Sequence, residues 1–380
     1  MSKLKLIVLP ILLPLCAAAQ CSSNLVSSGS YPGASGPAEH LVFMPPSNCY
    51  NGAMILFAHE YVAPGSPANA WLSQLALPDG TSLPALVNGL GFGFAASSFS
   101  KEGLAILQGI QDTKTLTAII AGQHIPVQKY FITGASEGGL VTVKSIENDP
   151  SYAGGVAVCG PIGSFRSQIN YFGDARVLFD YFFPGVLTTG TAVESAINIP
   201  SKLIDNWTSV YEPAVVEALN ANPLATLQLL STAKIPIGLS LSNATSAITG
   251  VLWYNVFATN DARSTLNGNP YDNIDRHYTG SFDDARLNAL VARFAADSTA
   301  LDNLNNYETT GLLENPLVTL HTIFDPIVPF WQETLYDAKV QDERDPQQLT
   351  QIPVLAYGHC NVTGLEAEAA LATLLLKTGL

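Results

Sequence analysis

Residues 134–139 read Gly-Ala-Ser-Glu-Gly-Gly and lie between a predicted β-strand at 127–133 and a predicted helix that runs through about Glu147. In a G-x-S-x-G turn from strand to helix, the serine is held in a strained conformation with its hydroxyl above the edge of the sheet. Larger residues at the glycine positions would clash in such a turn. We therefore predict that Ser136 is a nucleophile and that Gly134 and Gly138 shape the turn around it. The alternative is an ordinary glycine-rich turn.

A serine hydroxyl is a weak nucleophile unless a neighbouring base takes its proton. The chain has six histidines, and His359 lies between the last predicted strand, 352–357, and the last predicted helix, 364–377. Its loop is expected at the same edge of the sheet as Ser136. An exposed histidine without a function is the usual alternative for such a loop, but the order of the residues along the chain favours a base.

A third group must orient the imidazole ring and stabilise its cation. Asp325 ends the predicted strand 317–324 and opens the stiff turn Asp-Pro-Ile-Val-Pro. Aspartate before proline is also a common turn former. Asp302 and Glu314 are weaker candidates because both belong to the helical region described below or to its exit. We predict that Asp325 orients His359.

The chain alternates strand-like and helix-like patterns from about residue 38, as a mostly parallel sheet with helices on both faces requires. Between residues 161 and 315 the strand signals vanish and helical patterns rich in alanine, leucine and aromatic residues take over. The sequence therefore predicts a core of residues 20–160 and 316–380, interrupted by a mainly helical cap at 161–315. The expected strands are 40–44, 53–58, 91–97, 127–133, 155–160, 317–324 and 352–357, and the expected cap helices are 168–183, 214–230, 246–259 and 284–296.

The elbow at Ser136, the acid after the penultimate strand and the histidine after the last strand resemble the α/β-hydrolases, which use this order of serine, acid and histidine. The resemblance covers about residues 50–160 and 315–380. It implies an α/β-hydrolase fold, with a mostly parallel sheet flanked by helices and a large helical cap between the sixth and seventh strands. It also implies a serine hydrolase that cleaves carboxylic esters through an acyl-enzyme, with neither metal nor cofactor.

Two other functions stay open. A serine peptidase of the prolyl oligopeptidase type shares the sheet, the order of the three residues and often the doubled glycine, although the region before the first strands is too short for a propeller. A catalytically silent binding protein on the same fold is the third possibility, because a fold does not imply an activity.

The α/β-hydrolases usually carry His-Gly after their third strand, where backbone N–H groups help to hold the oxyanion. Here the predicted strand 53–58 runs into His59-Glu60-Tyr61, with glutamate in place of the glycine. The resemblance implies that the N–H groups of Tyr61 and Glu137 form the oxyanion hole and that His59 orients the loop. A carboxylate at position 60 is unfavourable near a developing oxyanion unless it points away.

Residues 1–19 have the features of a secretory signal peptide: the cationic Lys3 and Lys5, an apolar run at 6–15 and small residues at 17–19. The run is shorter than the roughly 20 residues that a spanning helix needs. We predict a secreted protein, extracellular or periplasmic, with no membrane anchor after cleavage.

Loss of Cys16 with the signal peptide leaves Cys21, Cys49, Cys159 and Cys360, an even number for an oxidising compartment. We favour the pairs Cys21–Cys49 and Cys159–Cys360, because the members of each pair occupy comparable positions in the predicted organisation. His359-Cys360 is also similar to the feruloyl esterase and tannase group, in which a disulfide joins the histidine's neighbour to the residue before the serine. That residue is Ala135 here. Buried, reduced cysteines are the alternative, and no C-x-x-C or H-x-x-x-H spacing predicts a metal site.

The composition limits which molecules the protein is expected to bind. The chain carries 17 lysines and arginines against 31 aspartates and glutamates, a formal charge of −14, so nucleic acid is not an expected partner. Charged residues make up 13% and hydrophobic residues 47%, which indicates a large core. Many aromatic residues lie in the cap, where most should form its own core. Those at 171–183 follow the sheet directly and could line a pocket for an ester substrate with an apolar or aromatic group.

Overall fold

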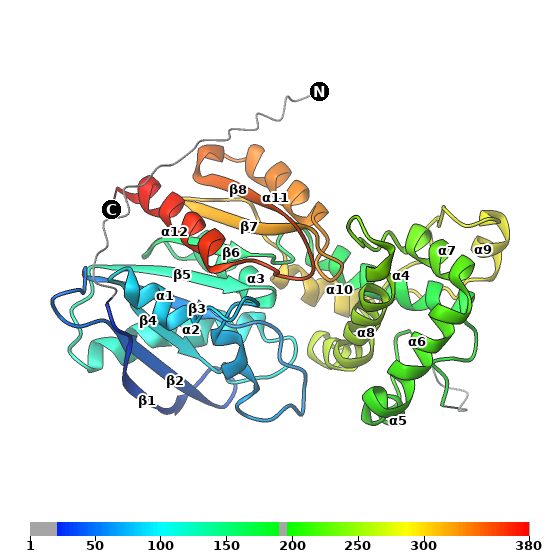
Figure 1. The fold of residues 1–380 in the computed structure, drawn as a ribbon, viewed down its shortest axis with the longest axis horizontal. Helices are drawn as coiled ribbons and strands as arrows, with labels where there is room; N and C mark the ends of the chain where they lie inside the picture. The colour runs from blue at the N-terminus through cyan, green and yellow to red at the C-terminus, as the bar shows by residue number, and fades with distance from the viewer. Residues whose placement is uncertain (1–20, 190–195, 380) are drawn as a thin grey trace.

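The structure is a computed structural model that describes residues 21–189 and 196–379. A sheet with helices on both faces occupies one side of the molecule, and a helical region occupies the other (Figure 1). The chain enters that region after β6 and returns to the sheet at β7. The predicted signal peptide at 1–19 lies outside the described residues.

The sheet has eight strands in the order β1-β2-β4-β3-β5-β6-β7-β8. Strand β2 pairs antiparallel with both β1 and β4, and all remaining neighbours are parallel. The predicted, mostly parallel sheet is thus confirmed. The strands are β1 (Asn24–Pro32), β2 (Pro37–Met44), β3 (Ala53–Ala58), β4 (Gly93–Ser97), β5 (Lys129–Ala135), β6 (Tyr152–Val158), β7 (Leu317–Phe324) and β8 (Leu349–Tyr357).

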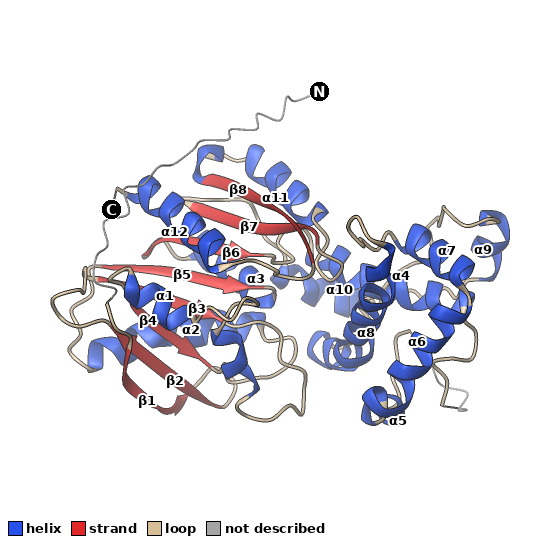
Figure 2. Cartoon of the chain, viewed as in Figure 1, coloured by secondary structure: helices blue, strands red, loops and turns tan. Residues whose placement is uncertain are grey.

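Strand β3 shows how the sheet is buried on both faces, since all six of its residues are buried. Met54 and Leu56 face the core formed with helices α2 (Ile106–Gly122), α3 (Glu137–Asn148) and α11 (Trp331–Gln341). Ile55 and Phe57 face the other core, formed with α1 (Leu83–Gly89) and α12 (Gly364–Thr378). Neighbouring side chains of a strand point to opposite faces, so a strand covered on both sides is apolar throughout. Figure 2 shows this layering, with helices on both sides of the strands.

The helical region between β6 and β7 has a hydrophobic core of its own, which includes Trp207, Leu229 and Val251. The predicted helical insertion at this place in the sheet order is therefore confirmed. Its helices are α4 (Phe165–Phe182), α5 (Ser201–Asp205), a π-helical turn (Trp207–Tyr211), α6 (Glu212–Ala221), α7 (Pro223–Ala233), α8 (Ala244–Leu266) and α9 (Asp284–Leu290). The last helix of the segment, α10 (Ser298–Leu304), packs instead into the core of the sheet through Ala300 and Leu304.

Several predicted elements differ from the observed ones. Strand β1 was not predicted, because most of its residues are polar and exposed and it carries no apolar pattern. The helix predicted over 214–230 is two helices, since the chain breaks before Pro223 and Asn222 caps α7 by accepting a hydrogen bond from the N–H of Ala225. The helix predicted over 284–296 ends at Leu290. Helices α1, α5 and α10 were also missed.

The chain contains both favoured disulfides. Cys21–Cys49 joins the residues before β1 to the connection between β2 and β3. Cys159–Cys360 joins the end of β6 to the loop after β8. Across residues 21–189 and 196–379, none of the helices combines the length and the apolar character that crossing a bilayer requires.

Candidate active site

Ser136 lies alone between the end of β5 and the start of α3, with φ 53° and ψ −118°. A positive φ costs a non-glycine residue about 1–3 kcal/mol, and such strain concentrates at functional sites. The turn is held by its backbone, because the N–H of Ser136 donates to the carbonyl of Val158 at 2.9 Å. A Cβ atom on Gly134 would clash with the carbonyl of Gly138, and one on Gly138 would clash with the carbonyl of Ala58. Only glycine fits at these two positions of the elbow.

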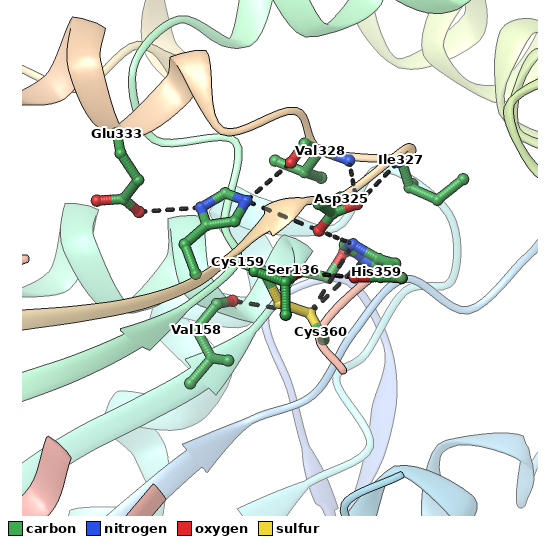
Figure 3. The surroundings of a disulfide bond; sticks show 12 residues. Ser136, Val158, Cys159, Asp325, Ile327, Val328, Glu333, His359 and Cys360 are labelled. Atoms are coloured by element: carbon green, nitrogen blue, oxygen red, sulfur yellow. Dashed lines mark hydrogen bonds and ion pairs between the residues drawn. A yellow bond between two sulfur atoms is a disulfide. The ribbon is translucent and has the colours of Figure 1, made fainter. Parts of the chain in front are cut away.

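The structure brings together the predicted nucleophile, base and acid (Figure 3). The Oγ atom of Ser136 lies 2.8 Å from Nε2 of His359, and Nδ1 of His359 lies 2.7 Å from Oδ2 of Asp325. The other oxygen of Asp325 accepts hydrogen bonds from the N–H groups of Ile327 and Val328. Asp325 is fully buried and Ser136 is 4% exposed. These contacts fix Nδ1 as the protonated nitrogen and leave Nε2 to accept a proton from the serine.

Two opposing effects act on the pKa of His359. Burial lowers the pKa of the ring, but the charge and the hydrogen bond of Asp325, together with the charge of Glu60, raise it above its ordinary value. The imidazolium form is therefore stabilised where it would arise during proton transfer.

A disulfide braces the loop that carries His359. Cys360, the next residue, is bonded to Cys159 at the end of β6, beside the strand that leads into the elbow. Both cysteines have positive φ, 43° for Cys159 and 47° for Cys360. Within the described ranges, these two sulfurs and His359 form the one group close enough together to resemble a metal site. The sulfurs are already bonded to each other, so neither is available as a thiolate ligand.

The loop after β3 is positioned by side-chain hydrogen bonds. Nδ1 of His59 lies 2.6 Å from the carbonyl oxygen of Glu60, and its ring stacks on Phe99. The N–H of Glu60 donates to Oε1 of Gln74 at 2.7 Å. Tyr61, at the end of this loop, lines the same cavity as Ser136 and Glu137. The N–H of Glu137 belongs to the first residue of α3, where backbone donors lack intrahelical acceptors.

Glu60, which replaces the expected glycine, lines a second cavity, between the sheet and helices α1 and α12, together with Gln74 and Cys360. Burial raises the pKa of Glu60, and the charge of the nearby His359 lowers it. The charge of Glu60 acts in turn on His359 and on Tyr254 of the cap.

An apolar cavity of about 90 Å³ lies over Ser136 between the core and the cap. Helix α4 contributes Phe165, Ile169 and Phe172, and helix α8 contributes Tyr254, Ala258 and Ala262. The rings of Phe172 and Tyr254 stack with centroids 5.1 Å apart, and both residues line this cavity together with Ser136. Of the aromatic residues at 171–183, Phe172 lines this cavity, whereas Phe179 and Phe183 belong to the core of the cap.

The position of each element now decides the fold. Strand β2 is antiparallel to both of its neighbours, β1 and β4, and β4 lies between β2 and β3. The turn that holds Ser136 follows β5, and the segments that carry Asp325 and His359 follow β7 and β8. The chain has the α/β-hydrolase fold.

Comparison with solved structures finds other proteins of related architecture. The chain resembles an acylaminoacyl peptidase of Pyrococcus horikoshii, with a TM-score of 0.47, 8% identity and coverage of 93% of this chain and 41% of that one. It resembles an esterase of Pyrococcus furiosus at a TM-score of 0.45 and 10% identity, covering 92% and 90%. It also resembles the rice cell wall degrading esterase LipA of Xanthomonas oryzae at a TM-score of 0.43 and 14% identity, covering 93% and 86%. The chain thus spans less than half the length of the peptidase.

No protein-family model matches the sequence of this chain, and no curated protein matches it either.

Sequence reasoning missed the polar groups that surround the acid and the nucleophile. Gln168 of α4 donates to the carbonyl of Ile327, and His321 of β7 bonds the carbonyl of Val328. Tyr254 of α8 lines the cavity over Ser136 from the cap. These residues occur in ordinary helix and strand patterns without a local motif. For His321, the one available signal was a histidine inside a strand whose other residues are apolar or threonine.

Proposed function

We propose that the protein is a serine hydrolase that cleaves carboxylic esters through an acyl-enzyme. The observation that carries the proposal is the continuous chain of short contacts from Ser136 Oγ through both nitrogens of His359 to the buried Asp325, at 2.8 and 2.7 Å. Distances of this kind allow proton transfer along the chain. The strained elbow adds support, because it holds the hydroxyl in a conformation that the chain would otherwise avoid.

Each residue has a defined task in the reaction. Ser136 attacks the ester carbonyl while His359 takes its proton, and Asp325 keeps the ring oriented and stabilises the imidazolium. The N–H groups of Tyr61 and Glu137 receive the negative charge on the carbonyl oxygen. His359 then gives its proton to the departing alkoxide, which leaves as an alcohol. In the second half a water molecule, deprotonated by His359, releases the acid from Ser136.

The cavity over Ser136 favours an apolar portion of the substrate. It is lined mainly by apolar side chains from α4 and α8, with Gln168 as the polar exception on the cap side. A pocket of this composition gains most from the burial of an aliphatic or aromatic group. The substrate is therefore an ester with an apolar acyl or alcohol group next to the scissile bond.

We also propose that the protein is secreted. Two disulfides, one of which braces the loop of His359, suit an oxidising compartment outside the cytoplasm. Mass spectrometry of the protein exported by an expressing cell should find an N-terminus near Gln20. Retention of Lys3 and Lys5 in the exported protein would contradict cleavage at this place.

The test of the activity compares p-nitrophenyl acyl esters with aminoacyl and prolyl anilides. Ester hydrolysis should be lost in Ser136→Ala and retained in Ser145→Ala, which removes another buried hydroxyl from the neighbouring helix α3. Hydrolysis of anilides alone would favour the peptidase. No turnover, together with no labelling of Ser136 by a fluorophosphonate, would favour a binding protein.

A further inference from the structure

A second histidine lies behind the candidate acid. His321, on β7, and Glu333, in the first turn of α11, are both buried and face each other across the interface between strand and helix. The imidazole of His321 faces Glu333 through Nδ1 and Asp325 through Nε2. The proposed reaction does not use either residue.

The hydrogen bonds of this pair define its protonation. Nε2 of His321 lies 2.8 Å from the carbonyl oxygen of Val328, which can only accept, so Nε2 carries a proton. Nδ1 lies 3.0 Å from Oε1 of Glu333. The other carboxylate oxygen accepts from the hydroxyl of Thr319 at 2.5 Å and from the amide of Gln351 at 2.7 Å. Thr319 and Gln351 donate to Oε2, so Oε1 is placed to accept a hydrogen bond from a proton on Nδ1.

The surroundings of His321 favour its imidazolium form. Burial lowers the pKa of His321, but the hydrogen bond and charge of Glu333, together with the charge of Asp325, outweigh burial and raise that pKa above its ordinary value. The ring of Phe330 packs against the imidazole with centroids 5.6 Å apart and brings no charge.

His321 also contacts the turn that carries the acid. Its Nε2 lies 3.7 Å from Oδ2 of Asp325, the oxygen that faces His359. The peptide group of Val328 is held at both ends, because its N–H donates to Oδ1 of Asp325 at 3.0 Å and its carbonyl accepts from His321. One side chain therefore fixes the geometry of the turn and places a positive charge beside the carboxylate.

We propose that His321 is a positioning residue for the ester hydrolysis proposed above: its imidazolium, held by Glu333, fixes the geometry of the acid turn, places a positive charge beside Asp325 and limits the basicity that Asp325 confers on His359. Glu333 acts as the partner that keeps His321 charged. The inference rests on the proposed function for its effect on rate, but its effect on the titration of His359 is a property of the protein alone.

The charged and titratable groups around His321, Asp325 and His359 come from four elements. Glu333 faces His321 from α11, Asp325 faces it from the acid turn, and Glu60 acts on His359 from the loop after β3. From α4, Tyr171 reaches the same turn, and burial raises its pKa well above the ordinary value. Burial does the same for Tyr336 of α11. Both phenols stay neutral wherever the histidines titrate.

Glu333→Gln removes the charge and keeps the hydrogen bonds. The introduced amide can donate to Nδ1 of a neutral His321 and accept from Thr319 and Gln351, while Nε2 still donates to Val328. Without the cation beside Asp325, protonation of His359 becomes easier. We expect the pKa of His359 to rise by about one unit, because the positive charge of His321 that opposed its protonation is lost. The simultaneous loss of the negative charge of Glu333 offsets this effect only in part.

Two readouts test this. ¹⁵N NMR of the imidazole nitrogens should find His321 as an imidazolium in the native chain and as the neutral Nε2–H form in Glu333→Gln, with the His359 titration moved to higher pH. The acid limb of kcat/KM for a p-nitrophenyl ester should move by the same amount. His321→Gln should move it in the same direction and lower kcat about tenfold, because a loosened acid turn misplaces the base.

His40→Gln serves as the control, since it replaces another buried histidine, on β2 and outside the site. This variant should leave the acid limb of the kcat/KM profile at the pH found for the native chain. A neutral His321 in the native chain, or an unchanged His359 titration in folded Glu333→Gln, would overturn the proposal. If the native protein hydrolysed no ester, the proposed function would fail while the NMR titration still decided the role of His321.

Discussion

The hydroxyl of Tyr171 donates a hydrogen bond of 2.6 Å to the carbonyl oxygen of Pro326, so the cap is joined directly to the turn that carries the candidate acid. One turn earlier on the same helix, Gln168 donates to the carbonyl of Ile327 at 2.7 Å. With His321 at Val328, side chains satisfy three successive carbonyl groups of the turn. Helix α4 therefore supports the acid as well as covering the nucleophile.

Tyr171→Phe should weaken both stability and activity. It leaves the buried carbonyl of Pro326 without its donor, which costs about 1–3 kcal/mol of unfolding free energy. The turn should also move more freely, lowering kcat for ester hydrolysis several-fold. Urea unfolding and steady-state kinetics measure the two effects. Tyr181→Phe, near the C-terminal end of α4, should change neither by a comparable amount.

The two disulfides should differ in their effect on activity. Loss of Cys159–Cys360 opens a link over 201 residues and frees the loop of His359, so Cys159→Ala with Cys360→Ala should lower both the melting temperature and kcat/KM. Loss of Cys21–Cys49, over 28 residues and away from Ser136, should lower the melting temperature alone. In the chain-entropy description the stability losses are about 5 and about 3.5 kcal/mol. Equal loss of activity in both double variants would contradict a bracing role for Cys159–Cys360.

Glu137 should set the upper end of the pH range in which the protein is most stable and most active. Burial raises the pKa of its carboxyl to about 8, against the opposing effects of the N–H of Ala105 and of Lys101. An acid whose pKa is higher in the folded chain holds a proton that the unfolded chain has lost. Its contribution to stability is therefore complete below about pH 4 and disappears as the pH rises to about 8. Ionisation also places a negative charge next to Ser136.

Glu137→Gln retains an acceptor for the N–H of Ala105 and cannot ionise. The variant should melt higher than the native chain at about pH 8, should differ little at about pH 4, and should lose the decline of kcat/KM on the basic side. Glu102→Gln, in the loop before α2, is the matched control. If kcat/KM of Glu137→Gln still declined on the basic side as in the native chain, a group other than Glu137 would cause that decline.

Tyr254→Phe tests the contribution of the cap to chemistry. Tyr254 lines the cavity that Ser136 also lines, and its ring stacks on Phe172, so the variant keeps the packing and removes one hydroxyl from the cap side of the cavity. We expect kcat for p-nitrophenyl esters to fall about tenfold with little change in KM, as for the loss of a hydrogen bond made in the transition state. Tyr211→Phe, in the core of the cap, should leave kcat unchanged. A rise in KM alone would assign Tyr254 to substrate binding.

The sequence predicted the parts of the site that depend on local chemistry. The elbow around Ser136 needs glycine at 134 and 138 whatever surrounds it, because backbone carbonyls occupy the space of a side chain. The ends of parallel strands meet at one edge of a sheet, so the order of Ser136, Asp325 and His359 was enough to expect them together. Strand β3 could be predicted because burial on both faces makes every residue apolar. Strand β1 could not, because an edge strand with exposed polar residues resembles a loop.

The sequence by itself determined the mostly parallel part of the sheet, the elbow and the place of the helical insertion, since each follows from a local pattern or from the order of elements. Only the tertiary structure decided how the four cysteines pair and which side chains surround Ser136, Asp325 and His359. Gln168, Tyr254, His321 and Glu333 come from a strand and three helices whose patterns reflect packing alone. It also decided that Glu60 lies near His359. The physical reason is that the direction of a buried polar side chain depends on partners from distant segments, and no local pattern records those partners.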